Sequence, residues 1–87
     1  SNGVEVLVSP ETYQAIVTEY LAVCAADQAA GADMASVPDD AMRWDEAVLK
    51  VMRQQRPREW RFLVESLNVG TPTVRPGPPR VLRGVAL

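Results

Sequence analysis

The residues of this sequence with the clearest chemical potential are arginines interleaved with aromatic side chains around Pro57. The cluster comprises Arg53, Arg56, Arg58, Trp60, Arg61 and Phe62. Guanidinium groups bind carboxylates and phosphates, and an aromatic ring flanked by arginines is a composition favoured at binding hot spots. Arg75 and Arg80 follow in the C-terminal part of the chain. This composition predicts a binding surface for an acidic or mixed partner.

The sequence carries no recognisable catalytic or metal-binding signature. It contains no His and a single Cys, so zinc and most transition metals lack their usual ligands. The adjacent acids Asp39-Asp40 and Asp45-Glu46 would point about 100° apart on a helix, and no glycine-centred calcium loop surrounds them. Glycines that bracket a lysine, as in phosphate-binding loops, are also absent. We therefore expect that the protein is not an enzyme and that it binds no cofactor and no metal ion.

Charge is strongly segregated along the chain. Residues 1–42 contain seven acidic residues and no Lys or Arg, whereas residues 43–87 contain nine basic and four acidic residues. The formal net charge of −2 hides this separation. Segregated charge can steer association with an oppositely charged partner or with a second copy of the chain. We therefore expect a protein partner and keep a homo-oligomer open.

Length and composition fit one small domain, because 87 residues that are 47% apolar can build one core but not two. We predict a helical domain over residues 1–70, with residues 1–3 treated as a cloning remnant. A Pro- and Arg-rich extended tail over residues 71–87 either packs on the helices or stays mobile. Cys24 cannot form an internal disulfide, and no apolar run reaches the ~18 residues of a membrane span. A cytoplasmic protein without membrane contact is the expectation.

A short strand followed by a capped helix is predicted to open the domain. Residues 4–8 alternate weakly and are rich in Val, which favours a strand. Ser9 can cap the next helix with its hydroxyl, and Pro10 fits the first helical position. Gly31 lies just beyond the expected end of this helix. The spacing of apolar residues predicts one buried stripe, made of Tyr13, Ile16, Val17, Tyr20, Leu21 and Cys24.

A central helix is predicted over residues 38–55, with two different faces. One strip is wholly charged and typical of a solvated face: Asp39, Arg43, Glu46, Lys50 and Arg53. The opposite half is apolar and wide enough to contact two neighbouring elements: Ala41, Met42, Trp44, Val48, Leu49, Val51 and Met52. Asp45 lies on the apolar side, so it either pairs with an arginine or reaches solvent through a small rotation of the helix.

A third helix is predicted to begin at Pro57, because proline fits the first helical turn and disfavours helix in the residue before it. The apolar residues of this helix from Trp60 onward form a second buried stripe, and Phe62 projects from nearly the opposite side of the helix. It is therefore either covered by the tail or the opening strand, or open to a partner. The stripe itself comprises Trp60, Leu63, Val64 and Leu67.

Two further segments bear on association. Residues 71–80 are predicted to be extended and polyproline-like, and residues 81–87 could pair with the opening strand or lie across the helices. Small residues on the outward side of the first helix would let another helix approach closely, although alanine favours a helix without any partner. These residues are Ala15, Thr18, Ala22, Ala25 and Ala26.

Residues 4–13, with the sequence Val-Glu-Val-Leu-Val-Ser-Pro-Glu-Thr-Tyr, resemble the strand-to-helix step of Phd/YefM-type bacterial antitoxins. The similarity covers this stretch alone. The DNA-binding segment and the toxin-binding tail of that family have no counterpart in these 87 residues. The resemblance implies an antitoxin-like regulator and assigns no functional residues.

The sequence as a whole predicts a mainly helical, three-helix domain that acts without catalysis as a protein-interaction or assembly module. The alternative is a nucleic-acid-binding or antitoxin-like regulatory domain whose arginines hold phosphates, although the acidic first half would repel them. The predicted partner-binding residues are Arg56, Arg58, Arg61, Phe62, Arg75 and Arg80.

Overall fold

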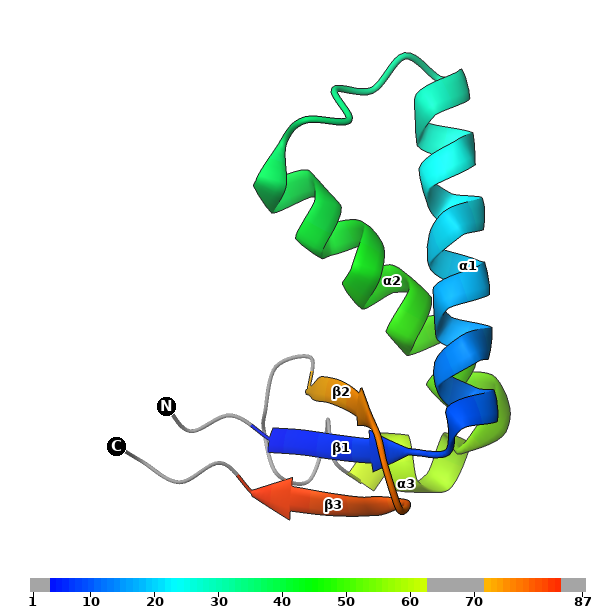
Figure 1. Cartoon of the computed structure of the whole chain (residues 1–87), viewed down its shortest axis with the longest axis vertical. Helices are drawn as coiled ribbons and strands as arrows, with labels where there is room; N and C mark the ends of the chain where they lie inside the picture. The colour runs from blue at the N-terminus through cyan, green and yellow to red at the C-terminus, as the bar shows by residue number, and fades with distance from the viewer. Residues whose placement is uncertain (1–3, 63–71, 84–87) are drawn as a thin grey trace.

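In the part of the chain that the structure describes, three helices pack on a small three-stranded sheet (Figure 1). The computed structural model describes residues 4–62 and 72–83, with the backbone alone for residues 80–83. The predicted mainly helical fold is confirmed for these residues. In chain order the elements are β1 (Val4–Val8), α1 (Pro10–Ala29), α2 (Val37–Gln55), α3 (Pro57–Arg61), β2 (Thr73–Pro76) and β3 (Arg80–Arg83).

The two long helices begin and end where local chemistry favours it. The Ser9 side chain accepts a hydrogen bond from the Thr12 backbone N–H at 3.2 Å, and Pro10 occupies the first helical position, as predicted. Ser36 caps α2 in the same way, accepting from the Asp39 N–H at 3.4 Å. Gly31, just beyond α1, has φ of +83°, a conformation that costs glycine little. The start of α1 agrees with the prediction, and α2 begins at Val37, one residue before the predicted start.

The C-terminal segment completes the sheet around β1. β1 pairs in parallel with β2 and antiparallel with β3, in the strand order β2-β1-β3. The sequence predicts a polyproline-like segment over residues 71–80, but Thr73–Pro76 forms a parallel strand instead. The cause is Val74, which is buried in the core opposite Val6. The predicted alternative that residues 81–87 pair with the opening strand is confirmed for residues 81–83, and Arg80, predicted to be polyproline-like, joins the same strand.

Residues 77–79 carry the chain across β1 from one edge of the sheet to the other. The Gly77 N–H donates to the Val8 carbonyl at 2.9 Å. A Cβ at position 77 would lie 3.3 Å from Leu7 Cδ1, so glycine permits this close crossing. Leu7 alternates with the core-facing valines of β1 and is nevertheless buried. The crossing explains why Leu7 is covered on the face of the sheet opposite to the helices.

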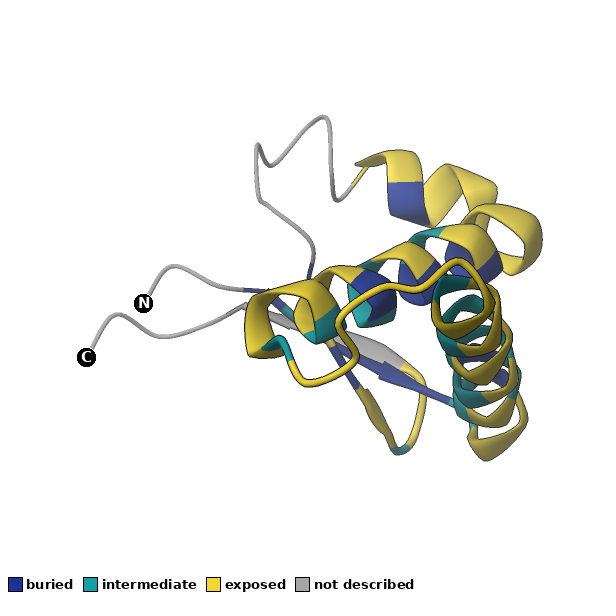
Figure 2. Ribbon diagram, turned by 90° about the horizontal axis from the view of Figure 1, so that it is seen from above, coloured by how far each residue is buried: buried dark blue, intermediate teal, exposed yellow. Residues whose placement is uncertain are grey.

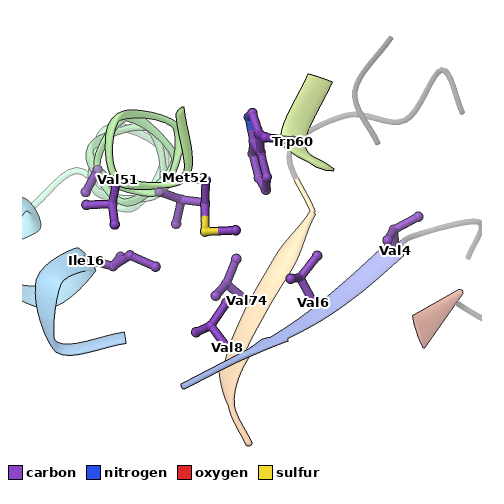
Figure 3. Packing of buried hydrophobic residues seen from close by; sticks show 10 residues of the cluster. Val4, Val6, Val8, Ile16, Val51, Met52, Trp60 and Val74 are labelled. Carbon is purple, nitrogen blue, oxygen red and sulfur yellow. The ribbon is translucent and has the colours of Figure 1, made fainter. Parts of the chain in front are cut away.

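The core lies where the sheet meets the second half of α2, the start of α1 and α3. Figure 3 shows Trp60 of α3 pointing toward the strands, with Met52 of α2 and Ile16 of α1 on the other side of the cluster. In Figure 2 the buried residues lie on the strands, on one side of α2 and at a few positions of α1 and α3. The cluster comprises Val4, Val6, Val8, Ile16, Ala47, Val48, Val51, Met52, Trp60 and Val74.

Two predicted buried stripes are too long, because the helices extend beyond the sheet. Figure 1 shows α1 and α2 diverging from the sheet toward the loop that joins them. Leu21 is 59% exposed and Met42 is 68% exposed, although periodicity places both on apolar faces. In α1 the buried residues are Thr12 and Ile16. The predicted continuation of the third helix through Leu67 lies outside the described residues.

Candidate functional site

The short helix α3 positions the predicted aromatic and arginine cluster. Trp60 is 2% exposed and anchors the inner side of α3 in the core. Phe62 directly follows α3 with helical backbone angles, two residues and therefore about 200° beyond Trp60, and is 57% exposed. Arg58 and Arg61 are exposed on the same helix. The helix thus holds one aromatic ring inside the protein and presents another at the surface beside two cations.

The arginines of this region differ in how far their charges are already neutralised. Arg56 Nη1 lies 3.1 Å from both carboxylate oxygens of Glu59, which forms an ion pair at the surface. Among the described residues, neither Arg58 nor Arg61 forms an ion pair. Within the described part of the chain, no carboxylate neutralises the charges of these two exposed guanidinium groups.

The other two predicted site residues lie elsewhere on the molecule. Arg75 Nη2 lies 2.6 Å from Glu5 Oε1, an ion pair between β2 and β1. Arg75 and Arg80 both pair in register with Leu7, one on each side of β1. Arg75 follows the core-facing Val74, so it lies on the face opposite to Trp60 and α3. The structure therefore places four of the six predicted residues on or directly beside α3, and the other two on the strands that flank β1.

An open groove of about 890 Å³ along α2 is the feature that sequence reasoning missed. Periodicity alone showed charged and apolar faces, but not that Met42 and Leu49 border the charged strip on an unfilled surface. Asp45 is half-buried at this groove and forms no hydrogen bond or ion pair with a described residue, in line with the predicted route to solvent. The lining residues are Asp27, Ala32, Asp39, Met42, Arg43, Asp45, Glu46, Leu49, Lys50, Arg53 and Gln54.

The charged strip of α2 is not wholly solvated, contrary to the sequence prediction. Arg43 is 4% exposed, and its Nε lies 2.6 Å from Asp27 Oδ2 of α1. Lys50 Nζ pairs with Glu19 Oε1 of α1 at 2.8 Å. Both cations thus bind acids on the neighbouring helix rather than the acids four residues earlier on their own. Sequence spacing could not show this, because it depends on how α1 lies against α2.

Further polar and aromatic contacts join α1 to α2. Thr12 Oγ1 donates to Gln55 Oε1 at 2.7 Å near the sheet. Farther out, the Tyr20 hydroxyl donates to Asp40 Oδ1 at 2.5 Å. The Trp44 ring lies 5.5 Å from the ring of Tyr20 and 5.9 Å from that of Tyr13, measured between centroids. The helix pair is therefore held by specific side-chain contacts where it leaves the core.

We expect the stability contributed by Tyr20 to be lost at alkaline pH. The hydrogen bond to Asp40, with a smaller contribution from Cys24, raises the pKa of Tyr20 above its ordinary value of 10.0. Because the folded state holds the phenolic proton more tightly, this stability is fully present below pH 10.0 and falls as the pH rises beyond it. Urea unfolding of wild type and Tyr20→Phe at about pH 8 and about pH 11 should show a narrowing difference in free energy. An unchanged difference would contradict this assignment.

Three further features bear on function in the described part of the chain: the cysteine, groups that could bind a metal ion, and helices that could span a membrane. Cys24 is half-buried and free. Across residues 4–62 and 72–83, no group of three or more His, Cys, Asp or Glu side chains could hold a metal ion. None of the helices described in these ranges combines the length and apolar character needed to cross a bilayer.

Comparison with family models, with curated proteins and with solved structures finds no match to this chain.

Proposed function

We propose that this chain is a non-catalytic protein-interaction module. Its docking surface, called here the α3 surface, consists of Arg58, Arg61 and Phe62. One observation supports the proposal above all. Phe62 keeps 57% of its surface exposed beside two arginines that no described carboxylate pairs, while Trp60 of the same helix is fully engaged in the core.

The physical gain from docking at this surface comes from the aromatic ring. Burying a phenylalanine side chain contributes about 1.5–3 kcal/mol relative to leaving it exposed. Arginines at the rim add orientation and a faster encounter with an acidic partner. Arg56 and Arg75 already form ion pairs within the chain, so we expect them to contribute less than Arg58 and Arg61. The matching partner surface is an apolar pocket bordered by carboxylates.

Affinity enrichment from an extract of the producing cells tests this function. Wild type, Phe62→Ala and the double variant Arg58→Glu/Arg61→Glu serve as immobilised baits, and bound proteins are quantified by mass spectrometry. Leu21→Ala is the matched control, because Leu21 is as exposed as Phe62 but lies on α1. We expect a protein that is retained by wild type and the control and lost with both α3 variants. Equal retention on all four baits would contradict the proposal.

A second candidate function is nucleic-acid binding through the same surface. It is favoured by the same juxtaposition, since exposed aromatic rings can stack on bases while arginines hold phosphates. Fluorescence anisotropy with random-sequence single- and double-stranded nucleic acid, at about 50 and about 200 mM salt, distinguishes the two functions. Binding that collapses at the higher salt and needs Arg58 and Arg61 would favour this candidate. Absence of binding at both salt concentrations would leave the protein-docking function.

A further inference from the structure

We infer that a partner of the α3 surface is a second copy of this chain, whose α2 groove receives Phe62, Arg58 and Arg61. The inference rests on the proposed function and names the partner for it. Two features at separate places on the molecule support it. One is an aromatic ring between cations, and the other is an open groove of about 890 Å³ with apolar and anionic lining.

The groove is suited to an aromatic side chain. Met42 is 68% exposed and Leu49 is half-buried, and both line it. Neither belongs to the cluster of fully buried core residues, so each retains apolar surface for a partner to cover. Methionine adapts its shape readily and contacts aromatic rings favourably. A phenylalanine ring in this groove would gain the apolar contacts that Phe62 lacks within its own chain.

The unpaired charge around the groove is mainly negative. Arg43 and Lys50 are neutralised by Asp27 and Glu19 of α1. Three carboxylates that line the groove form no ion pair with a described residue: Asp39, Asp45 and Glu46. Among the lining cations, Arg53 alone forms no ion pair with a described residue. Arg58 and Arg61 carry the opposite sign beside Phe62. The groove and the α3 surface therefore match in both apolar character and charge.

This contact must join different copies of the chain. Phe62 is 57% exposed, so it does not occupy the groove of its own molecule. Trp60, two residues before it, is fixed in the core and holds α3 in place. Each copy thus offers one α3 surface and one groove. Depending on the angle between them, the contact generates a reciprocal dimer, a closed ring or an open filament.

Sedimentation velocity over about 5–500 μM protein, at about 50 mM salt, tests the contact directly. We expect the weight-average mass of wild type to rise above the 9.5 kDa of one chain as concentration increases. Phe62→Ala and Met42→Lys should each weaken association at least about tenfold, because each removes one side of the apolar contact. Leu21→Lys is the matched control and should associate like wild type, since Leu21 is exposed but does not line the groove.

Mixing the two defective variants gives the decisive result. Phe62→Ala retains an intact groove and Met42→Lys retains an intact α3 surface, so an equimolar mixture can form one wild-type contact. We expect the mixture to form a species of twice the chain mass at concentrations at which neither variant forms it alone. Because both residues are exposed, circular dichroism should show that both variants are folded. A mixture that stays monomeric would overturn the inference, because Phe62 would then not dock in the groove.

The experiment also separates this inference from the function on which it rests. Wild type that stays monomeric over the whole range, together with Phe62-dependent enrichment of a different protein, would overturn the second copy as partner and retain protein docking. Monomeric wild type without any Phe62-dependent partner would overturn both. Mass growth that Phe62→Ala and Met42→Lys leave unchanged would overturn the contact, since another surface would then mediate association.

Discussion

Trp60→Ala is expected to lower the free energy of unfolding by about 3–5 kcal/mol. Trp60 is 2% exposed and joins α3 to the strands and to Met52 of α2 (Figure 3). Its removal would leave a large cavity that the surrounding valines cannot fill. A domain of this size usually has a net stability of only ~5 kcal/mol, so the variant should be barely folded at room temperature.

Urea denaturation followed by circular dichroism measures this loss, with two matched variants. Trp60→Phe should lose less, because it keeps an aromatic ring and removes a buried Nε1–H that has no hydrogen-bond partner among the described residues. Phe62→Ala should lose less than about 1 kcal/mol, because most of the ring is already exposed. A loss for Phe62→Ala as large as that for Trp60→Ala would place Phe62 inside the protein and remove it from the α3 surface.

Asp27→Ala is expected to destabilise the domain more than Arg43→Met does. Arg43 is 4% exposed, and its guanidinium depends on the Asp27 carboxylate 2.6 Å away. Removing Asp27 leaves a cation buried without its partner, whereas removing Arg43 leaves a carboxylate that is 42% exposed and can be hydrated. Breaking a buried pair on the acid side is therefore the more costly change.

Thermal unfolding of the two variants and of the double variant measures this asymmetry. We expect Asp27→Ala to lower Tm by roughly 5–10 °C and Arg43→Met to change it by less than about 3 °C. The methionine preserves apolar volume at the site, so the double variant should regain most of the Tm lost by Asp27→Ala. Equal losses for both single variants would contradict the description of Arg43 as a buried cation that needs Asp27.

Local chemistry made part of the fold predictable from sequence. Ser9 and Pro10 start α1 as expected, because capping depends only on neighbouring residues. The exposure of Phe62 opposite Trp60 also agrees with helical periodicity at α3. In contrast, Leu21 lies on a regular apolar stripe and is still exposed. Periodicity gives the face of a helix, but not how far the neighbouring element extends along it.

Other features could not be predicted from the sequence, because they depend on how the helices and strands pack against one another. Arg43 fits a pair with Asp39 by spacing, yet it binds Asp27 because α1 lies beside it. Val74 draws a proline-rich segment into the sheet as a parallel strand, against its local preference for a polyproline-like conformation. The groove along α2 likewise depends on the shape of the folded surface. The positions of Met42 and Leu49 in the sequence do not predict it. Of the predicted site residues, Arg58, Arg61 and Phe62 lie together at α3.

Photo-crosslinking at position 62 tests the central claim, that the α3 surface docks a protein, most directly. Phe62 is replaced by p-benzoylphenylalanine, and the same replacement at exposed Leu21 serves as the control. Irradiation in an extract of the producing cells should give adducts with a protein, or with a second copy of the chain, at position 62 and not at position 21. These adducts should resist nuclease and disappear when Arg58 and Arg61 are both changed to Glu. Crosslinks at position 62 that join only residues of the same chain would contradict the claim, because they would show that the protein itself covers Phe62.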